Sequence, residues 1–396
     1  MAIEESAPRP DKGYSLFYDP KVRGFVFQAL MVVLLVALVS WIATNTYTNL
    51  RRANIASGFD FLGARSGFDI SQTLISYTTD STYFRAFLVG LLNTLLVAGL
   101  GVVLASVVGL LVGIARLSKN WLVAKLATIY VETLRNIPLL LLLLFWYKAV
   151  LSVLPSPRQS FTLPFGSFLS NRGLTLPATQ FQPGAGWTLL AFIAAIVFVI
   201  GLAFWANRRR MATGKPFPTL WVSLVALIGF PIAVFYATGS PLNLNFPELR
   251  GFNFVGGFNI HPEFLALLLG LSLYTASFIA EVVRGGILAI SNGQTEAAYA
   301  LGFRPGRTLR LIIIPQALRV IIPPLTNQYL NLIKNSSLAV AIGYPDLVSV
   351  FSGTVMNQTG QAVEVIAITM GVYLLISLIT SAFMNWFNSR IALKER

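Results

Sequence analysis

Residues Glu296–Pro315 read EAAYALGFRPGRTLRLIIIP, a short arginine-bearing stretch between two long apolar runs. Just upstream, Ser291 and Gln294 have the spacing of a capping box, in which two side chains satisfy free backbone N–H groups at a helix start. A helix should therefore begin near Asn292 and end at Gly302, which suits a left-handed cap. With about ten residues it is too short to be stable alone, so another surface must pack on it.

The expected helix carries small and apolar residues on one side. Ala297 and Leu301 are four residues apart and Ala298 and Leu301 are three apart, so they should share a docking face that a partner could approach closely. Pro305 suits the first turn of a second helix, which would carry a stripe of arginines. These arginines could make a specific contact or simply mark the cytoplasmic edge of the next membrane span. They are Arg304, Arg307 and Arg310.

The composition of the whole chain places it in a membrane. Of its 396 residues, 55% are hydrophobic and 11% are charged, and the mean hydropathy is +0.71. Soluble domains have about 47% apolar and about 25% charged residues. The net charge of +14 suits contact with lipid headgroups, so nucleic acid is not an expected partner. Because there is no cysteine and one histidine, His261, no thiolate or imidazole metal site is expected.

Eight apolar runs are long enough to cross a bilayer core of about 30 Å. They cover residues 25–44, 87–115, 121–153, 187–206, 219–237, 263–289, 315–342 and 363–388. The third contains Pro138, and the seventh contains Pro323 and Pro324, so these two are the least regular. The first should be an uncleaved span; the alternative, a cleaved signal peptide, normally has a shorter apolar region. The expected fold class is an all-α polytopic membrane protein.

Basic residues set the expected orientation. Clusters of lysine and arginine precede the first run and follow the second, fourth, sixth and eighth, so eight alternating spans would put them all on one side. By the positive-inside rule this side is cytoplasmic, with both termini facing it. Arg51, Arg52, Arg65 and Arg85 disagree, but they lie in a loop of about 40 residues, where the rule weakens.

Two segments on the opposite side have a different character. Residues 154–186 contain five prolines, which predicts an irregular external loop without a further helix. Residues 241–262 alternate apolar and polar side chains, and the stretch FVGGF (Phe254–Phe258) contains two glycines that suit a tight turn. We expect a small β element there, with a hairpin at the two glycines.

Several motifs resemble the membrane subunits of ATP-binding cassette (ABC) importers. Glu296-Ala-Ala, Gly302 and Ile312-Ile-Ile-Pro315 are spaced as in the EAA loop of that family, with Ile314 where leucine is usual. Other stretches resemble its polar amino acid branch, and the length is most similar to the general L-amino-acid importer permeases of Gram-negative bacteria. These stretches are Gly90-Leu-Leu-Asn-Thr-Leu-Leu96, Val131-Glu-Thr-Leu-Arg-Asn-Ile-Pro-Leu139, and Pro315-Gln-Ala-Leu-Arg319 with Pro323-Pro324 and Lys334-Asn-Ser-Ser-Leu338.

The resemblance implies a five-helix core with additions. The core would comprise residues 87–153 and 263–390, the second part including the EAA coupling loop at 291–315. Around it would lie a cytoplasmic N-terminal segment (1–24), an added first transmembrane helix (25–44), a periplasmic loop (45–86) and an insertion (154–262) that carries a helix pair and periplasmic loops. An inserted pair leaves the direction of every later span unchanged.

The resemblance also implies a transport subunit and not an enzyme. In such importers of the bacterial inner membrane, a periplasmic amino-acid-binding protein delivers the substrate and two membrane subunits form the path. A dimer of ATPase subunits, which uses ATP and Mg²⁺, powers transport. No GxxxxGK[ST] loop, the motif that binds ATP phosphates, occurs here, so no cofactor is expected on this chain. The second permease is expected to be a different chain. The residues implied in ATPase coupling are Glu296, Ala297, Ala298, Leu301, Gly302, Arg304, Pro305 and Arg307.

Polar residues within the core spans are candidates for the substrate path, because polar groups are costly in a bilayer. They are Glu281, Arg284, Asn331, Lys334, Asn335, Ser336 and Ser337. Glu281 could bind the ammonium group of an amino acid while the cluster at 331–337 binds its carboxylate. Alternatively, Glu281 and Arg284 could pair with each other. An ion-coupled secondary amino acid transporter is the rival function, but it would leave the EAA motif unexplained.

Overall fold

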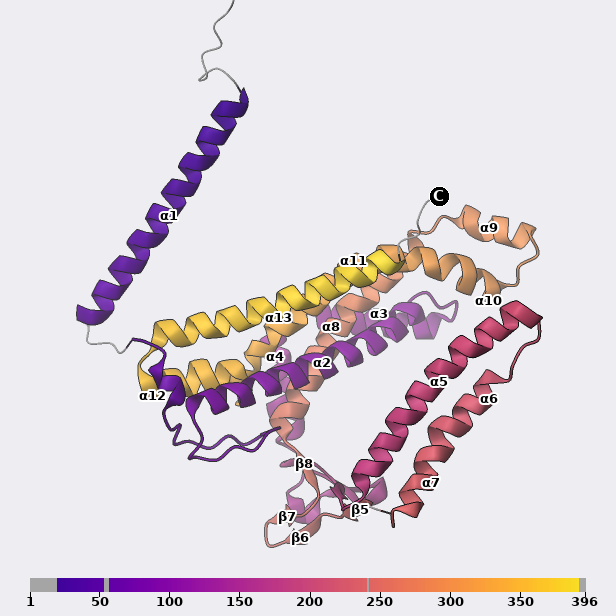
Figure 1. Ribbon diagram of the computed structural model, residues 1–396, viewed down its shortest axis with the longest axis horizontal. Helices are drawn as coiled ribbons and strands as arrows, with labels where there is room; N and C mark the ends of the chain where they lie inside the picture. Colours follow the sequence, from indigo (N-terminus) through magenta and orange to yellow (C-terminus); the bar gives the residue numbers. More distant parts are fainter. Residues whose placement is uncertain (1–19, 53–56, 241, 392–396) are drawn as a thin grey trace, which may run out of the picture.

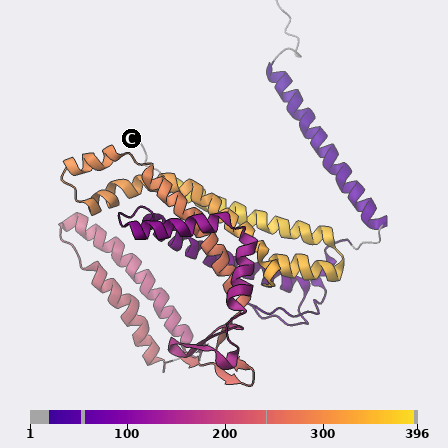
Figure 2. The same cartoon turned by 180° about the vertical axis from the view of Figure 1, so that it is seen from behind.

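The computed structural model describes residues 20–52, 57–240 and 242–391. Long helices dominate it, with a small group of β-strands at one end (Figures 1 and 2). Within the described residues, seven helices are long and apolar enough to cross a membrane, and a bent pair would make an eighth. The expected fold class, an all-α polytopic membrane protein with a small β element, is therefore confirmed. The predicted segment 1–24 lies mostly outside the described residues.

The third apolar run is a bent pair of helices and not one straight span. α3 (Trp121–Asn136) meets α4 (Leu139–Leu144) and its continuation η3 (Phe145–Leu151) at an angle of 109°. The break lies at Pro138, and Ile137 before it is extended, with φ −94° and ψ 130°. The ring of a proline disfavours helical geometry in the preceding residue, which explains the position of the bend.

The centre of the helical part is α8 (Pro262–Leu288), which packs along α2 (Tyr83–Ala115). Glycine on α2 permits the approach, because a Cβ atom added to Gly109 would lie 2.6 Å from the Cβ atom of Ile279. Small residues commonly allow membrane helices to come this close, since lipid supplies no hydrophobic drive between them. The start of α2 at Tyr83 is four residues earlier than the predicted span.

α11 (Ile314–Asn335) packs on both α8 and α13 (Ala362–Ile391). It is part of a helical stretch that begins at Pro305, ten residues before the predicted span, and continues to Ile342. Pro323 and Pro324 lie inside α11 without ending it. The neighbouring helical elements are α10 (Pro305–Thr308), η7 (Leu309–Ile313), η8 (Ser336–Ile342), η9 (Val348–Val355) and α12 (Met356–Thr359).

The stretch at 90–96, which marked the family resemblance, has a clear structural role. The Asn93 side chain is buried, and its Nδ2 donates hydrogen bonds of 2.9 Å to the carbonyls of Gln72 and Pro345. Thr94 is buried as well, and its Oγ1 accepts from the N–H of Leu347 at 3.0 Å. These bonds join α2 to the segment before it and to the turn between η8 and η9.

The strands form three small antiparallel sheets in the described residues. The largest has four strands in the order β1, β2, β3 and β8, while β4 pairs with β5 and β6 pairs with β7. Their bounds are β1 (Phe161–Leu163), β2 (Ser167–Ser170), β3 (Gly173–Leu176), β4 (Ala178–Phe181), β5 (Leu242–Asn245), β6 (Glu248–Arg250), β7 (Asn253–Val255) and β8 (Phe258–Ile260). The β element therefore combines both ends of the insertion.

The prediction of an irregular loop at 154–186 is wrong, because this segment supplies strands β1 to β4. Its prolines all lie outside the strands, where no ladder hydrogen bond is lost. Pro157 begins η4 (Pro157–Gln159), and Pro164 begins η5 (Pro164–Gly166) between β1 and β2. Each strand has only three or four residues, so the usual strand pattern is too short to recognise in the sequence.

The β element expected at 241–262 is present, but the predicted hairpin at its two glycines is wrong. Gly256 and Gly257 have φ values of +79° and +68° and connect β7 to β8, which belong to different sheets. β8 pairs with β3, far away in the sequence. A Cβ atom on Gly257 would lie 2.6 Å from the carbonyl oxygen of Leu176, so this glycine also serves the contact with β3.

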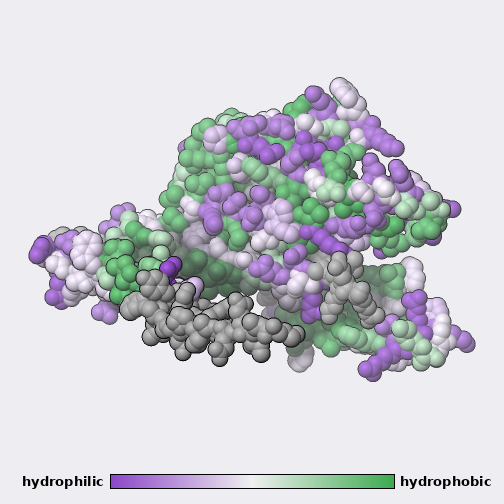
Figure 3. Space-filling model, turned by 90° about the horizontal axis from the view of Figure 1, so that it is seen from above, coloured by the Kyte–Doolittle hydropathy of each residue, from purple (hydrophilic) through white to green (hydrophobic). Residues whose placement is uncertain are grey.

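Residues 20–52 and 185–237 expose large apolar surfaces. α5 (Ala185–Thr213) packs against a second helix formed by α6 (Thr219–Leu224), η6 (Val225–Gly229) and α7 (Phe230–Ala237). α1 (Pro20–Arg52) stands apart from the other helices in both ribbon views, and its apolar side chains are exposed (Figures 1 and 2). Apolar areas, green in Figure 3, lie beside polar patches on the surface. Such surfaces suit contact with lipid.

Candidate functional site

The EAA-like stretch forms the predicted helix that ends at a glycine. α9 (Asn292–Ala300) begins where expected, and Gly302 follows it with φ +77°. The Gly302 N–H donates to the Tyr299 carbonyl at 2.9 Å, and the Phe303 N–H donates to the Ala298 carbonyl at 3.0 Å. This pair of bonds is a Schellman motif, which requires a left-handed residue and therefore favours glycine.

The start of α9 differs from the predicted capping box. Ser291 occupies the position before the helix, but its side chain makes no capping hydrogen bond. The Gln294 Oε1 atom accepts from the Nε2 atom of Gln316 on α11 at 3.4 Å. The capping-box prediction is therefore wrong, although the helix start is right, because a contact with another helix takes the glutamine side chain.

The predicted docking face of α9 is divided between two environments. Ala298 is 1% exposed, since α9 lies against α10 and η7 of its own chain. Leu301 is 77% exposed, and Glu296 and Ala297 are exposed as well. The prediction that Ala297, Ala298 and Leu301 form one open face is thus wrong for Ala298. α9 lies at the end of the molecule opposite the strands (Figure 1).

Pro305 occupies the first turn of α10, as predicted, and three arginines lie around it. Arg304, Arg307 and Arg310 are exposed, and none forms an ion pair in the part of the chain that the structure describes. Exposed cations beside an apolar helix are suited to lipid headgroups or to an acidic partner surface. The two interpretations of these arginines therefore both remain.

Glu281 and Arg284 form part of a charged network. Arg284 Nη2 lies 2.6 Å from Glu281 Oε1, and Arg284 Nε donates to Glu281 Oε2 at 3.2 Å. Arg116, at the end of α2, also donates to Glu281 Oε2 and lies 3.6 Å from Glu132 of α3. The alternative in which Glu281 and Arg284 neutralise each other is therefore confirmed. The network joins α2, α3 and α8, so these charges have a structural role.

The polar cluster at 331–337 is also divided. Asn331 and Lys334 are exposed and three residues apart on α11, so they share a face. Ser336 is 1% exposed, and its Oγ donates to the Ile333 carbonyl at 2.7 Å. Ser337 Oγ donates to the Lys334 carbonyl at the same distance, and Asn335 is half-buried. Asn331 and Lys334 are thus the open members of the cluster.

The structure does not bring Glu281 to this cluster. A Cβ atom on Gly101 would lie 3.2 Å from Leu332 Cδ2 and 3.8 Å from Ser272 Oγ, so Leu332 is level with Ser272 on α8. Glu281 is nine residues farther along α8, a rise of about 14 Å. Glu281 and residues 331–337 therefore lie at different levels of the helices, and a joint role in holding one amino acid stays a prediction.

Residues 209–393 match a family described as the binding-protein-dependent transport system inner membrane component. Over 382 residues, the chain is 55% identical to the general L-amino acid transport system permease protein AapQ of Rhizobium johnstonii. That likeness covers 96% of this chain and 95% of AapQ. The chain belongs to this permease family. It is also 44% identical to the glutamate/glutamine/aspartate/asparagine transport system permease protein BztB of Rhodobacter capsulatus, over the whole of both chains.

The family assignment covers the additions as well as the core of the permease. The matched family region begins in α5 and extends to residue 393, two residues beyond α13, so it includes α9 and α11. The likeness to AapQ and BztB extends over nearly the whole chain, including the inserted residues 154–262. The resemblance to the long general L-amino-acid permeases is therefore confirmed, and neither relative supports the ion-coupled alternative.

Sequence reasoning missed two members of the charged network of the permease. Arg116 and Glu132 belong to the same network as Glu281, although neither is among the site residues predicted from the sequence. The available signal was Glu132 itself, because an acidic residue inside an apolar run needs a partner. Within the described residues, no group of three or more His, Asp or Glu side chains is arranged to hold a metal ion.

Proposed function

We propose that this permease is the membrane subunit of an ATP-driven importer that moves L-amino acids from the periplasm to the cytoplasm. The near-full-length likeness to AapQ, a general L-amino acid permease, is the observation that carries the substrate class. The exposed, glycine-ended helix α9 supports the mode of coupling, since it offers a partner protein a rigid and accessible segment.

In this proposal, a pair of ATPase subunits binds the open surface of α9 and uses ATP and Mg²⁺. Glu296, Ala297 and Leu301 supply the contact, with Arg304 and Arg307 beside it, while Ala298 holds α9 on its own chain. α9 follows α8 almost directly and packs on the start of the helical stretch that contains α11. A displacement of α9 would therefore act on both core helices, as in other rigid-body switches.

The other partners follow from the importer assembly. A second permease, a different chain, completes the path, and a periplasmic binding protein delivers the amino acid. Asn331 and Lys334 on the open face of α11 are the polar groups of the cluster best placed to line this path, because their side chains are exposed in the single subunit. Membrane lipid covers the apolar surfaces of α1, α5 and α13.

The proposed orientation has both termini in the cytoplasm, within the bacterial inner membrane. It requires that the bent pair α3 and α4–η3 crosses the membrane once, so that eight spans alternate. Under that condition, α9 and its arginines lie on the cytoplasmic side, and the β element lies on the periplasmic side. The basic residues beside the spans support this direction.

The proposal is tested by reconstituting the complex that copurifies with this permease in proteoliposomes, with the binding protein inside or outside. Uptake of labelled L-amino acids should require ATP and the binding protein, and the amino acid should stimulate ATP hydrolysis. Uptake driven by a proton or sodium gradient without ATP would instead establish the ion-coupled function. A complex that copurifies without an ATPase would also contradict the proposal.

A further inference from the structure

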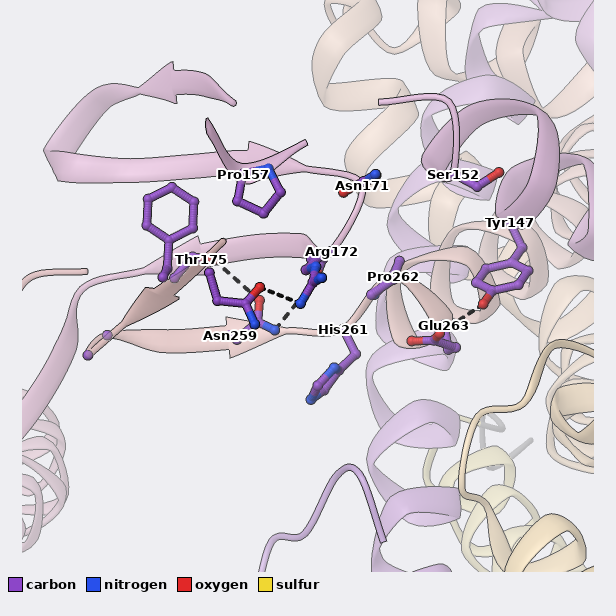
Figure 4. Close-up of a pocket in the computed structure, with 14 residues that line it drawn as sticks. Tyr147, Ser152, Pro157, Asn171, Arg172, Thr175, Asn259, His261, Pro262 and Glu263 are labelled. Atoms are coloured by element: carbon purple, nitrogen blue, oxygen red, sulfur yellow. Dashed lines mark hydrogen bonds between the residues drawn. The ribbon is translucent and has the colours of Figure 1, made fainter. Parts of the chain in front are cut away.

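A pocket of about 490 Å³ lies where the β element meets the outer ends of two core elements (Figure 4). The turn between β2 and β3 supplies Asn171 and Arg172 to its wall, and the first turn of α8 supplies Glu263. Tyr147 comes from η3. Its volume is in the range of small-molecule sites, about 300–1,000 Å³. The site therefore joins the insertion to the transport core.

Two opposite charges line this pocket without pairing. The Arg172 guanidinium donates to the Asn253 side chain, and the Glu263 carboxylate accepts from the Tyr147 hydroxyl at 2.9 Å. Neither Arg172 nor Glu263 forms an ion pair, with the other or with any further charge, among the residues that the structure describes. Two unneutralised charges in one cavity are positioned for a ligand that carries both signs.

A third polar group in the pocket has no partner. The Oδ1 atom of Asn171 is inaccessible to solvent and accepts no hydrogen bond in the described protein. A buried acceptor without a donor carries a desolvation cost of about 1–3 kcal/mol. The pocket thus offers one carboxylate to a cation and one guanidinium to an anion, while the inaccessible Asn171 Oδ1 atom is not offered to a ligand.

Hydrogen bonds fix the backbone on which Asn171 and Arg172 stand. The N–H of Asn171 donates to the Pro155 carbonyl at 2.9 Å, and the Asn259 side chain donates to the Arg172 carbonyl at 3.4 Å. β3, which directly follows Arg172, pairs with β8, which ends just before α8 and Glu263. The register of two paired strands therefore fixes where the backbones of Arg172 and Glu263 stand relative to each other.

We propose that this pocket is an external binding site for the zwitterionic backbone of a free α-amino acid. Arg172 binds the α-carboxylate, and Glu263 binds the α-ammonium group. The assignment of amino acids as the ligand class rests on the proposed function. The rest of the wall combines polar side chains, such as that of His261, with apolar residues and glycine, and Phe254 stacks on Phe168 at a centroid distance of 4.5 Å.

The test measures binding of labelled L-glutamine by the intact membrane complex in lipid nanodiscs, without the periplasmic binding protein. Arg172→Gln and Glu263→Gln should each weaken binding at least tenfold. Arg250→Gln is the matched control, because this exposed arginine of the same β element pairs with Glu248 and lies outside the pocket. Its affinity for L-glutamine should equal that of the unmodified complex.

Two derivatives of L-glutamine separate loss of a specific contact from loss of folding. The unmodified complex should discriminate against the α-carboxamide, which lacks the carboxylate, and against N-acetyl-L-glutamine, which lacks the ammonium. Arg172→Gln should lose only the first discrimination, and Glu263→Gln only the second. Equal loss of both by each variant would overturn the assigned contacts.

The inference is also overturned if the unmodified complex binds no free amino acid, or if both variants bind it as well as the control does. Weaker docking of the binding protein to Arg172→Gln, without a change in amino acid binding, would likewise overturn it. Amino acid uptake by the complete importer, measured separately from binding, distinguishes failure of this inference from failure of the proposed function. Normal ATP-dependent uptake with no binding at the pocket would contradict only this inference, whereas no amino acid uptake would contradict the proposed function.

Discussion

Gly90 of α2 lies so close to Leu347 that a Cβ atom added to the glycine would stand 3.0 Å from the Leu347 Cα atom. The neighbour is backbone and cannot rotate away. The contact holds the turn between η8 and η9 against α2, beside the hydrogen bonds of Asn93 and Thr94. A glycine in a sequence motif is thus explained by a backbone contact far away in the chain.

Gly90→Ala should therefore lower the stability of the permease. Moving the backbone at Leu347 to admit a methyl group should cost about 1–3 kcal/mol, the usual range for overpacking. The measurement is the thermal unfolding midpoint of the purified complex. Gly99→Ala is the matched control on α2, because a Cβ atom there meets no atom within 4 Å. An equal midpoint for both variants would contradict the contact.

Gly302→Val should abolish coupling without preventing membrane insertion. A β-branched residue is strained at a φ of +77°, so the Schellman motif should open and α9 should lose its fixed position. Gly302→Asn should retain much of the activity, since asparagine tolerates this backbone conformation. The measurement is ATP hydrolysis stimulated by amino acid and binding protein.

The control for Gly302 is Gly306→Ala in the neighbouring α10. Gly306 has no such positive φ and has open space around it, so the alanine variant should hydrolyse ATP normally. Normal stimulation in Gly302→Val would show that the backbone geometry after α9 does not matter for coupling.

Glu281→Gln should destabilise the complex, because it removes the carboxylate that Arg116 and Arg284 share. Loss of charged hydrogen bonds of this kind costs about 1.5–3 kcal/mol. The double variant Glu281→Gln with Arg284→Gln should recover part of the loss, since one cation is removed as well. The measurement is the thermal midpoint together with amino acid uptake. A stable Glu281→Gln protein without uptake would point instead to substrate binding by Glu281.

Asn331→Ala should reduce uptake several-fold while assembly and the thermal midpoint stay unchanged, because this side chain is exposed on α11 and supports no described contact of the core. Ser337→Ala is the control from the same cluster. Its hydroxyl bonds to the carbonyl of Lys334 on its own helix, so its removal should leave uptake normal. Equal uptake by Asn331→Ala and the unmodified complex would remove Asn331 from the proposed path.

Local chemistry explains which parts of the fold were predictable. Long apolar runs must form helices in a membrane, because every backbone polar group there needs an internal partner. Pro138 predicts the break of the third helix, and Gly302 predicts the end of α9. In each case the backbone constraint acts within a few residues. The strands at 154–186 could not be predicted, because each is short and is defined only by its backbone pairing with another strand.

The candidate sites show the same division. α9, its glycine cap and the proline restart at Pro305 were evident in the order of residues. Contacts between distant segments were not evident in the sequence. Ala298 is buried by its own chain, Gln294 accepts a hydrogen bond from α11, and Arg116 donates one to Glu281. The pocket between Arg172 and Glu263 had no signal in the sequence, because an exposed turn arginine and a helix-start glutamate are ordinary features.

By itself, the sequence determined that this protein is a polytopic membrane permease with a short glycine-capped helix between its sixth and seventh apolar runs. Apolar run length, proline and glycine act locally, and the motif spacing identifies the family. Only the tertiary structure decided which charges neutralise each other and which remain free in a pocket. The physical reason is that pairing depends on distances across helix contacts and strand registers, which join residues far apart in the chain.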